Sequence, residues 1–208
     1  MSLTPEDLTR LEECLAGDGI AVIPTDTVYG LACNPESESA MRRIYELKQR
    51  PPVKPSAVMF FALEPALESL TELGSRTRAA LGALLPGPIT LLLPNPEQRF
   101  PLACDPLGTH SVLLGLRVPA FSAPLAALAA LRVPAAQSSA NLSGDPDSRR
   151  LGDIPVELRE GADLVLDGGE LPGTASTVID LSEYEQSRIW RIVREGPLGR
   201  PTLERLLG

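Results

Sequence analysis

Short apolar runs alternate with amphipathic segments along the whole chain. Apolar runs of about four to eight residues are typical of strands that are buried on both faces. Apolar residues at helical spacing predict the helices between them. The predicted strands are 20–31, 56–61, 89–93, 112–118, 133–139, 162–167, 177–180 and 188–194. The predicted helices are 5–16, 38–48, 64–70, 75–85, 124–131 and 201–207, and 95–109 is a predicted loop.

The first predicted strand continues into hydroxyl-bearing residues without an intervening loop. If the chain stays extended past Pro24, successive side chains alternate between two faces. Thr25, Thr27 and Tyr29 then share one face and form a row of hydroxyls. An ordinary half-buried strand rich in β-formers explains the same pattern. The pattern alone leaves both interpretations open.

Strands interleaved with helices predict a mixed α/β (α+β) fold. We expect a single domain over residues 1–208, with a twisted mixed parallel and antiparallel sheet of about seven strands flanked by helices and a concave cleft. The directions should be mixed because some strands follow one another without a helix between them. With 208 residues and 43% hydrophobic content, the chain has the usual size of one domain.

Local signals define two helix ends. Thr4, followed by Pro5 and by Asp7 three residues after Thr4, predicts an N-cap. The second helix should end near Lys48, because proline at positions 51 and 52 disfavours the helical conformation of the residues before them. We therefore expect an extended segment in which Lys48 and Arg50 project to the same side.

Charge and cysteine content exclude several classes of protein. The formal net charge of -8 argues against a basic surface that binds nucleic acid over the whole protein, although a local basic cleft is compatible with it. Three cysteines without C-x-x-C spacing suggest neither a disulfide framework nor a zinc site, and they fit a reducing cytoplasm. Because no signal sequence or apolar run of about 20 residues is present, we expect a cytoplasmic protein without a membrane partner.

Common catalytic motifs are missing from the sequence. It has neither the P-loop pattern nor the dinucleotide-binding glycine pattern, and no G-x-S-x-G marks a hydrolase nucleophile. The one histidine, His110, lies in a predicted loop, and no carboxylate cluster suggests a protein-held metal. Classical triad chemistry and a resident metal site are therefore not expected.

Cations and small polar residues remain as the candidate chemistry. Lys48, Arg50 and Lys54 gather in one segment, and Arg117 ends an apolar strand, where it needs either an anionic ligand or a buried carboxylate. We expect Arg191 to form surface salt bridges instead. Such groups orient anionic reactants and neutralise charge as phosphate bonds rearrange, with Mg²⁺ brought in by the nucleotide. They favour nucleotidyl transfer over hydrolysis.

Seven motifs occur in a fixed order and together strongly resemble the YrdC-like family. They are residues 24–31 (PTDTVYGL), Lys48-x-Arg50-Pro51, Pro86-Gly87-Pro88-x-Thr90, Leu116-Arg117-Val118-Pro119, residues 139–144 (SANLSG), Ser176-Thr177-Val178 and Arg194-x-Gly196. The resemblance covers residues from about 8 to 200. Any one of these motifs is modest evidence, but seven motifs in the order of the family are highly specific.

The resemblance implies a synthase that joins L-threonine, bicarbonate and ATP into threonylcarbamoyl-AMP and releases pyrophosphate. A tRNA-modifying transferase complex would then use this product at adenosine 37. Lys48 and Arg50 would be catalytic. The implied ATP-binding residues are Lys48, Arg50, Ser139, Asn141 and Arg194. The implied L-threonine-binding residues are Thr27, Ser176, Thr25, Tyr29 and Arg117, the last as a bidentate partner of the carboxylate.

Three alternatives accompany this interpretation. Many members of the family carry a histidine where this chain has Met59, and the chain resembles the short form or the related YciO branch. The second alternative is a module that uses the same cleft to bind tRNA or double-stranded RNA, or the ribosome, without this activity. A family member that acts on another carbamoyl acceptor is a third.

Overall fold

Nine strands form one sheet in the computed structural model, which describes residues 3–51, 54–106, 108 and 113–208. Their order across the sheet is β7-β1-β2-β6-β3-β5-β4-β8-β9. The strands are β1 (Ile20–Ile23), β2 (Gly30–Cys33), β3 (Ala57–Met59), β4 (Ile89–Pro94), β5 (Leu113–Arg117), β6 (Ala135–Ser139), β7 (Leu164–Val165), β8 (Thr177–Asp180) and β9 (Arg191–Arg194).

The predicted mixed sheet is confirmed. The pairs β1–β7, β3–β5 and β4–β8 are parallel, and the other neighbours are antiparallel. The expected number of about seven strands is too low. All eight apolar segments contribute to the sheet, and residues 20–31 contain two strands instead of one, which gives nine.

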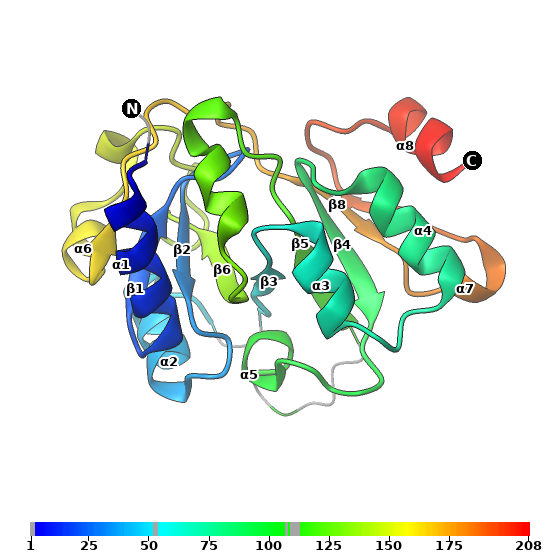
Figure 1. Ribbon diagram of the computed structural model, residues 1–208, viewed down its shortest axis with the longest axis horizontal. Coiled ribbons are helices and arrows are strands. Elements are labelled where there is room, and N and C mark those ends of the chain that lie inside the picture. Colours follow the sequence, from blue (N-terminus) through cyan, green and yellow to red (C-terminus); the bar gives the residue numbers. More distant parts are fainter. Residues whose placement is uncertain (1–2, 52–53, 107, 109–112) are drawn as a thin grey trace.

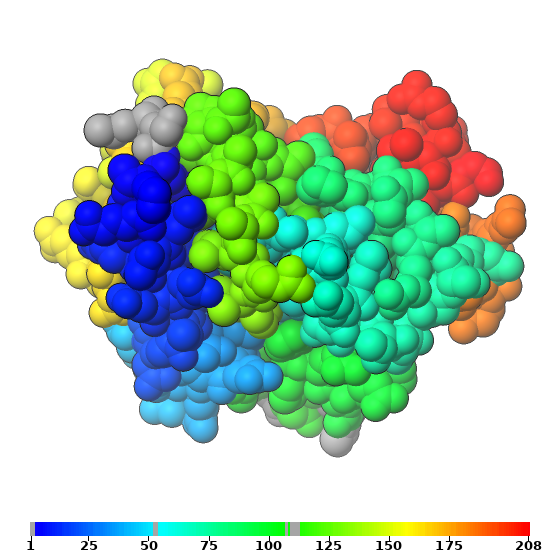
Figure 2. Space-filling view, in the orientation of Figure 1, coloured from blue at the N-terminus to red at the C-terminus, as the bar shows by residue number. Residues whose placement is uncertain are grey.

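Helices cover one face of the sheet. Figure 1 shows α1 (Pro5–Ala16), the 3-10 helix η1 (Ala123–Ala130), α3 (Leu63–Ser69) and α4 (Ser75–Leu84) in front of the strands. In the space-filling view these helices hide the sheet (Figure 2). Fully buried leucines of β4 and β5 form much of the core. The remaining helices are α2 (Glu38–Leu47), α5 (Pro101–Cys104), η2 (Leu151–Asp153), α6 (Val156–Glu160), α7 (Tyr184–Ser187) and α8 (Arg200–Leu207).

The predicted helix starts are confirmed by their caps. Thr4 and Asp7 form a reciprocal capping box at α1, and the Ser37 hydroxyl accepts a hydrogen bond from Ala40 N at α2. The predicted loop at 95–109 was partly wrong, since it contains α5. Three positions from the sequence analysis lie outside the described residues: 109, which ends this predicted loop, His110, and 112, where the next strand was predicted to begin.

The segment between β1 and β2 is a turn, so the predicted continuous strand was wrong. Ile23 pairs with Gly30 across an antiparallel hairpin, which reverses the chain within residues 24–29. The Thr25 hydroxyl closes this turn. It accepts hydrogen bonds from Thr27 N and Val28 N and donates to Val28 O at 2.7 Å. A side-chain oxygen that replaces ladder partners in this way favours a turn over a strand.

We predict that Thr25→Val destabilises the protein by about 2 kcal/mol, because Val keeps the shape but leaves buried backbone groups of the turn without their partner. Urea denaturation of the full chain measures this effect. Thr71→Val, on an exposed residue, serves as the matched control. Equal denaturation midpoints for both variants would contradict the role of the Thr25 hydroxyl.

Candidate functional site

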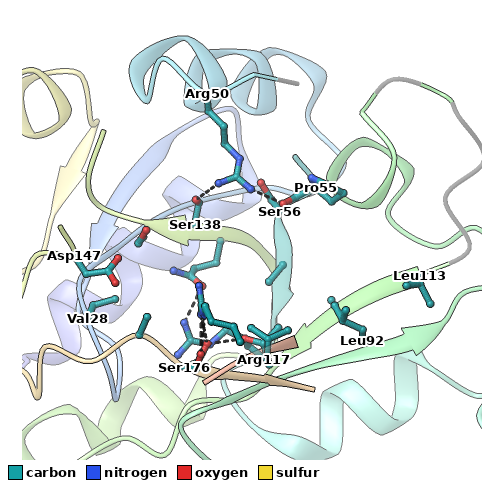
Figure 3. Close-up of a pocket in the computed structure, with 18 residues that line it drawn as sticks. Val28, Arg50, Pro55, Ser56, Leu92, Leu113, Arg117, Ser138, Asp147 and Ser176 are labelled. Atoms are coloured by element: carbon teal, nitrogen blue, oxygen red, sulfur yellow. Dashed lines mark hydrogen bonds between the residues drawn. The ribbon is translucent and has the colours of Figure 1, made fainter. Parts of the chain in front are cut away.

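A cleft of about 390 Å³ opens on the face of the sheet opposite the core leucines of β4 and β5. Residues of β3, β4, β5, β6, β8 and β9 line it, together with segments that flank these strands (Figure 3). Its polar and charged lining residues are Arg50, Ser56, Thr90, Arg117, Gln137, Ser138, Ser139, Asp147, Ser176 and Arg194.

Small residues at central positions of the sheet make room for the cleft. Ala57 of β3 pairs with Gln137 of β6, and Gly115 of β5 lies beside Ala57, where a Cβ atom at position 115 would be in ordinary van der Waals contact with Ala57 Cα at 3.5 Å. Both small residues line the cleft. Their neighbours in sequence, Val58 and Leu116, alternate to the other face and are fully buried there. The sheet is therefore hollow on one face and packed on the other.

Arg117 lies at the centre of the site and is 4% exposed. Its Nη2 donates to Asp26 Oδ1 at 2.9 Å and to Thr27 Oγ1 at 3.0 Å, and its Nη1 donates to Gln137 Oε1 at 3.1 Å. Burial lowers the pKa of Arg117, and the nearby Asp26 carboxylate opposes this effect. The sequence predicted that Arg117 pairs with either an anionic ligand or a buried carboxylate. The structure shows the buried carboxylate, which is that of Asp26.

Asp26 is the functional residue that the strand interpretation missed. Its Oδ2 accepts a hydrogen bond from Ala120 N at 3.0 Å, and burial raises the pKa of its carboxyl group, against the effect of Arg117. A continuous strand would point Asp26 away from Thr25 and Thr27. The turn instead brings Asp26 and Thr27 to the same guanidinium group.

Ser176 and Arg194 form a second group in the cleft. Arg194 Nη2 donates to Ser176 O at 2.8 Å and to Ser176 Oγ at 3.1 Å. The hydroxyls of Ser176 and Thr90 lie 2.8 Å apart. Ser176 is therefore held between β4 and β9, and Arg194 positions it directly.

Lys48 lies beneath the cleft and is 1% exposed. Its Nζ donates to Ser139 O, to Asn141 O at 2.6 Å and to Asn141 Oδ1 at 3.3 Å. The predicted extended segment was wrong here, because Lys48 has helical angles and Gln49 is left-handed with φ of 49°. Burial lowers the pKa of Lys48 to about 8, and the charge of Arg50 adds to this effect.

The segment after β6 depends on these contacts. Ser139 Oγ donates to Asn141 Oδ1, and Asn141 Nδ2 donates to Asp145 O. Ser143 N donates to Lys48 O at 3.1 Å. Ser139 lines the cleft, whereas Lys48 and Asn141 support it from below. We call residues 139–145 the β6 loop.

Arg50 reaches the same end of the cleft from the other side. Its Nη1 lies 3.4 Å from Ser138 Oγ, and its Nε and Nη2 donate to Lys54 O and Pro55 O (Figure 3). Burial lowers its pKa. Arg191 is exposed and forms ion pairs with Glu183 and Asp180, which confirms the predicted surface role.

All three hydroxyl residues of the predicted row, Thr25, Thr27 and Tyr29, are buried and absent from the described lining of the cleft. The Tyr29 hydroxyl accepts a hydrogen bond from Gly168 N and lies 2.9 Å from Gly169 O and 3.1 Å from Asp167 Oδ1. Burial raises its pKa to about 12. Tyr29 therefore attaches the hairpin to residues 167–169, and Thr25 shapes the turn that presents Thr27.

The site is rich in fixed donors and poor in acids. Among the described residues that line the cleft, Asp147 is the one carboxylate, and it has no ion pair or hydrogen bond in that part of the chain. Within the same described ranges, no group of three or more His, Cys, Asp or Glu could hold a metal ion, and no helix has the length and hydropathy to cross a bilayer. Such a cleft suits the binding of an anionic ligand.

Comparison with known proteins identifies similar chains. The family model Sua5/YciO/YrdC, described as "Telomere recombination", matches residues 13–196. Threonylcarbamoyl-AMP synthase from Pyrococcus abyssi is 31% identical over 190 residues, which are 91% of this chain and 54% of that protein. Threonylcarbamoyl-AMP synthase from Xanthomonas campestris pv. campestris (strain B100) is 34% identical over 177 residues, with coverage of 84% and 91%.

A solved structure shares the fold. The crystal structure of P. abyssi Sua5 complexed with L-threonine matches with a TM-score of 0.83 and 29% identity, and it covers 100% of this chain and 59% of that chain. The present chain therefore spans little more than half the length of the archaeal relative.

We predict that Lys48 titrates with a pKa of about 8. NMR of the lysine side-chain signals tests this directly, because Lys48 and Lys54 are the only lysines, and Lys54→Arg assigns the remaining signal. A neutral amine has one donor fewer than an ammonium group, so contacts to the β6 loop should weaken as the pH rises through about 8. A Lys48 midpoint near the ordinary lysine value of about 10.4 would contradict this.

Proposed function

Because this chain belongs to the Sua5/YciO/YrdC family, with its family match over residues 13–196, we propose that it is a threonylcarbamoyl-AMP synthase. It would join L-threonine, bicarbonate and ATP and release pyrophosphate. The observation that carries this proposal is the cleft beside Arg117, in which a buried guanidinium, hydroxyl groups and two further arginines surround space for an anionic ligand.

We assign the amino-acid end of the cleft to Arg117 and Ser176. Thr27 is fully buried and acts there through its hydrogen bond to Arg117. The L-threonine complex of the Pyrococcus relative supports the presence of such a site in this fold. Nη2 of Arg117 already donates to Asp26 and Thr27, so a bidentate contact through both Nη atoms would require Asp26 to release it. Thr25 and Tyr29 act through the shape of the hairpin in this proposal.

We assign the nucleotide end to Arg50 and Ser139, with Lys48 and Asn141 holding the β6 loop in place. Arg194 is the further residue that we propose to contact ATP, and its hydrogen bonds to Ser176 place it beside the amino-acid end. Arg50 and Ser139 line the cleft at the same end. Cations and hydroxyls that are fixed before the nucleotide binds stabilise the charge that develops on phosphate without further reorganisation.

The residues present fit Mg²⁺ carried by the nucleotide. Mg²⁺ is usually bound by one or two carboxylates together with substrate phosphates. Asp147 is the one carboxylate in the described lining of the cleft, and its charge also acts on Lys48 and Arg117. When bound, the ion neutralises phosphate charge. Asp147 would hold it.

The proposed reaction has two steps. The amine of L-threonine combines with bicarbonate to give a carbamate and water. A carbamate oxygen then attacks the α-phosphorus of ATP, which forms threonylcarbamoyl-AMP as the bond to pyrophosphate breaks. The protein contributes mainly by orienting both anionic reactants, because few titratable groups line the cleft.

Met59 bears on the activity because many members of the family carry a histidine there. It is fully buried on β3 and pairs in register with Arg117. A methionine side chain at this position provides no proton donor. We propose that the reaction proceeds without a general base at this position.

We place the reaction in the cytoplasm, before a tRNA-modifying transferase complex that would consume the product. The three cysteines are free, as is usual in a reducing compartment. The RNA-binding alternative has less support, because Lys48 is buried against backbone carbonyls and Lys54 is the exposed lysine of that segment.

We predict pyrophosphate release that requires both L-threonine and bicarbonate in addition to ATP. Release from ATP alone would contradict the proposal, and other amino acids tested in the same assay would reveal a different carbamoyl acceptor. An RNA-binding module without this activity would release no pyrophosphate under any of these conditions.

Variants of Lys48 and Arg117 should affect different kinetic constants. We predict that Arg117→Ala raises the KM for L-threonine by about tenfold or more, through loss of a charged hydrogen bond, and that Lys48→Ala mainly lowers kcat by loosening the β6 loop. Arg117→Lys is measured alongside because Arg117→Ala leaves Asp26 unpaired. Arg191→Ala, on the surface, is the control. Equal changes of kcat and KM in both Lys48→Ala and Arg117→Ala would contradict the proposal that the two residues act on different constants.

A further inference from the structure

Gln137 is a buried polar residue in the cleft whose side-chain amide is only half used. It lies on β6, is 4% exposed and lines the cleft. Its Oε1 accepts the hydrogen bond from Arg117 Nη1, which leaves Nε2 as the free end. Within the described residues Nε2 donates to no acceptor. Gln137 lines the cleft, and Nε2 is not one of the fully buried unpartnered atoms, so this donor is accessible to a ligand in the cleft.

Gly30 makes room for this amide. A Cβ atom at position 30 would lie 2.4 Å from Gln137 Nε2, so any side chain there would displace the Gln137 amide from its present position. Gly30 has an ordinary place in β2, opposite Ser139, so no turn requires glycine there. The absence of a side chain at this position lets the Gln137 amide lie against β2.

Arg117 lacks donors for a bidentate contact. Nη2 donates to Asp26 and Thr27, Nη1 donates once to Gln137, and Nε is buried without a partner among the described residues. A guanidinium group has five N–H donors. Three of them are used in these hydrogen bonds and the fourth is the buried Nε–H, so the second hydrogen of Nη1 is the donor that remains for a ligand. A carboxylate at Arg117 therefore needs a second donor from another residue.

We propose that Gln137 binds substrate, with its Nε2 supplying that second donor to a carboxylate-type oxyanion held at Arg117 Nη1. The oxyanion is the carboxylate of the amino acid or bicarbonate, which share this planar geometry. This inference rests on the proposed function and adds to it a residue that none of the seven sequence motifs contains. Asp26 then fixes the guanidinium, and Gln137 completes the anion site.

Gln137→Glu tests the inference, because Glu keeps the acceptor for Arg117 and replaces the amide donor with a negative oxygen. Isothermal titration of the full chain measures the binding of L-threonine, of bicarbonate, and of L-threoninol, which lacks the carboxylate. We expect the binding of one oxyanion to weaken by about tenfold or more in Gln137→Glu and by less in Gln137→Met. Gln186→Glu, the same charge change on an exposed residue, should leave binding unchanged.

The ligand that responds identifies the source of the oxyanion. Weaker L-threonine binding with unchanged L-threoninol binding assigns the amino-acid carboxylate, and weaker bicarbonate binding alone assigns bicarbonate. In addition, the side-chain amide signal of Gln137 in ¹⁵N NMR should shift with that ligand. A purely structural role of Gln137 would leave this signal in place.

Unchanged affinities in Gln137→Glu, with a wild-type chain that binds both oxyanions, would overturn the role of Gln137 and leave the proposed function intact. A wild-type chain that binds neither L-threonine nor bicarbonate would overturn both. Thermal unfolding of each variant shows whether a loss of binding instead reflects a loss of folding.

Discussion

The buried ion pair of Asp26 and Arg117 is the interaction on which the site depends. A guanidinium in the interior of a sheet loses its hydration, and this loss is tolerated only when its donors are satisfied by well-placed acceptors. Asp26 and Thr27 supply acceptors from the β1–β2 turn and Gln137 supplies another from β6. Removing one member of such a pair typically costs about 3–5 kcal/mol, because the other charge stays buried. The same contacts therefore connect β5, β6 and the hairpin and hold the charge that faces the ligand.

A second buried cation organises the other end of the cleft. Lys48 donates to backbone carbonyls at Ser139 and Asn141, so it determines the shape of the β6 loop from below. Arg50 approaches the loop from the side of the cleft. The two cations of the K-x-R motif thus have different roles, one beneath the surface and one on it. At both ends of the cleft, contacts within the protein hold the cations in place.

The charge of the site contrasts with that of the chain. The formal net charge is -8, yet Arg50, Arg117 and Arg194 line one cleft with a single carboxylate, Asp147, in its described lining. A concave region with one sign of charge attracts small anions even when the overall surface carries the opposite sign, whereas binding of a long polyanion requires an extended basic face. This distribution favours nucleotide and carboxylate ligands over RNA.

The sequence by itself determined the longer helices, the apolar strands, the mixed sheet and the family, because these depend on local spacing and on motifs in register. It missed the short helices α5, η2, α6 and α7, which have three to five residues each. Only the tertiary structure decided that residues 24–29 turn, that Lys48 points beneath the β6 loop, and that Asp26 and Gln137 meet Arg117. Asp26 and Arg117 are 91 positions apart in the chain. A hydrophobic pattern indicates which residues face the interior. It does not indicate which distant side chain each of them contacts. The apolar sequence around Arg117 predicted that its guanidinium needs an anionic partner. Only the fold identified that partner as Asp26.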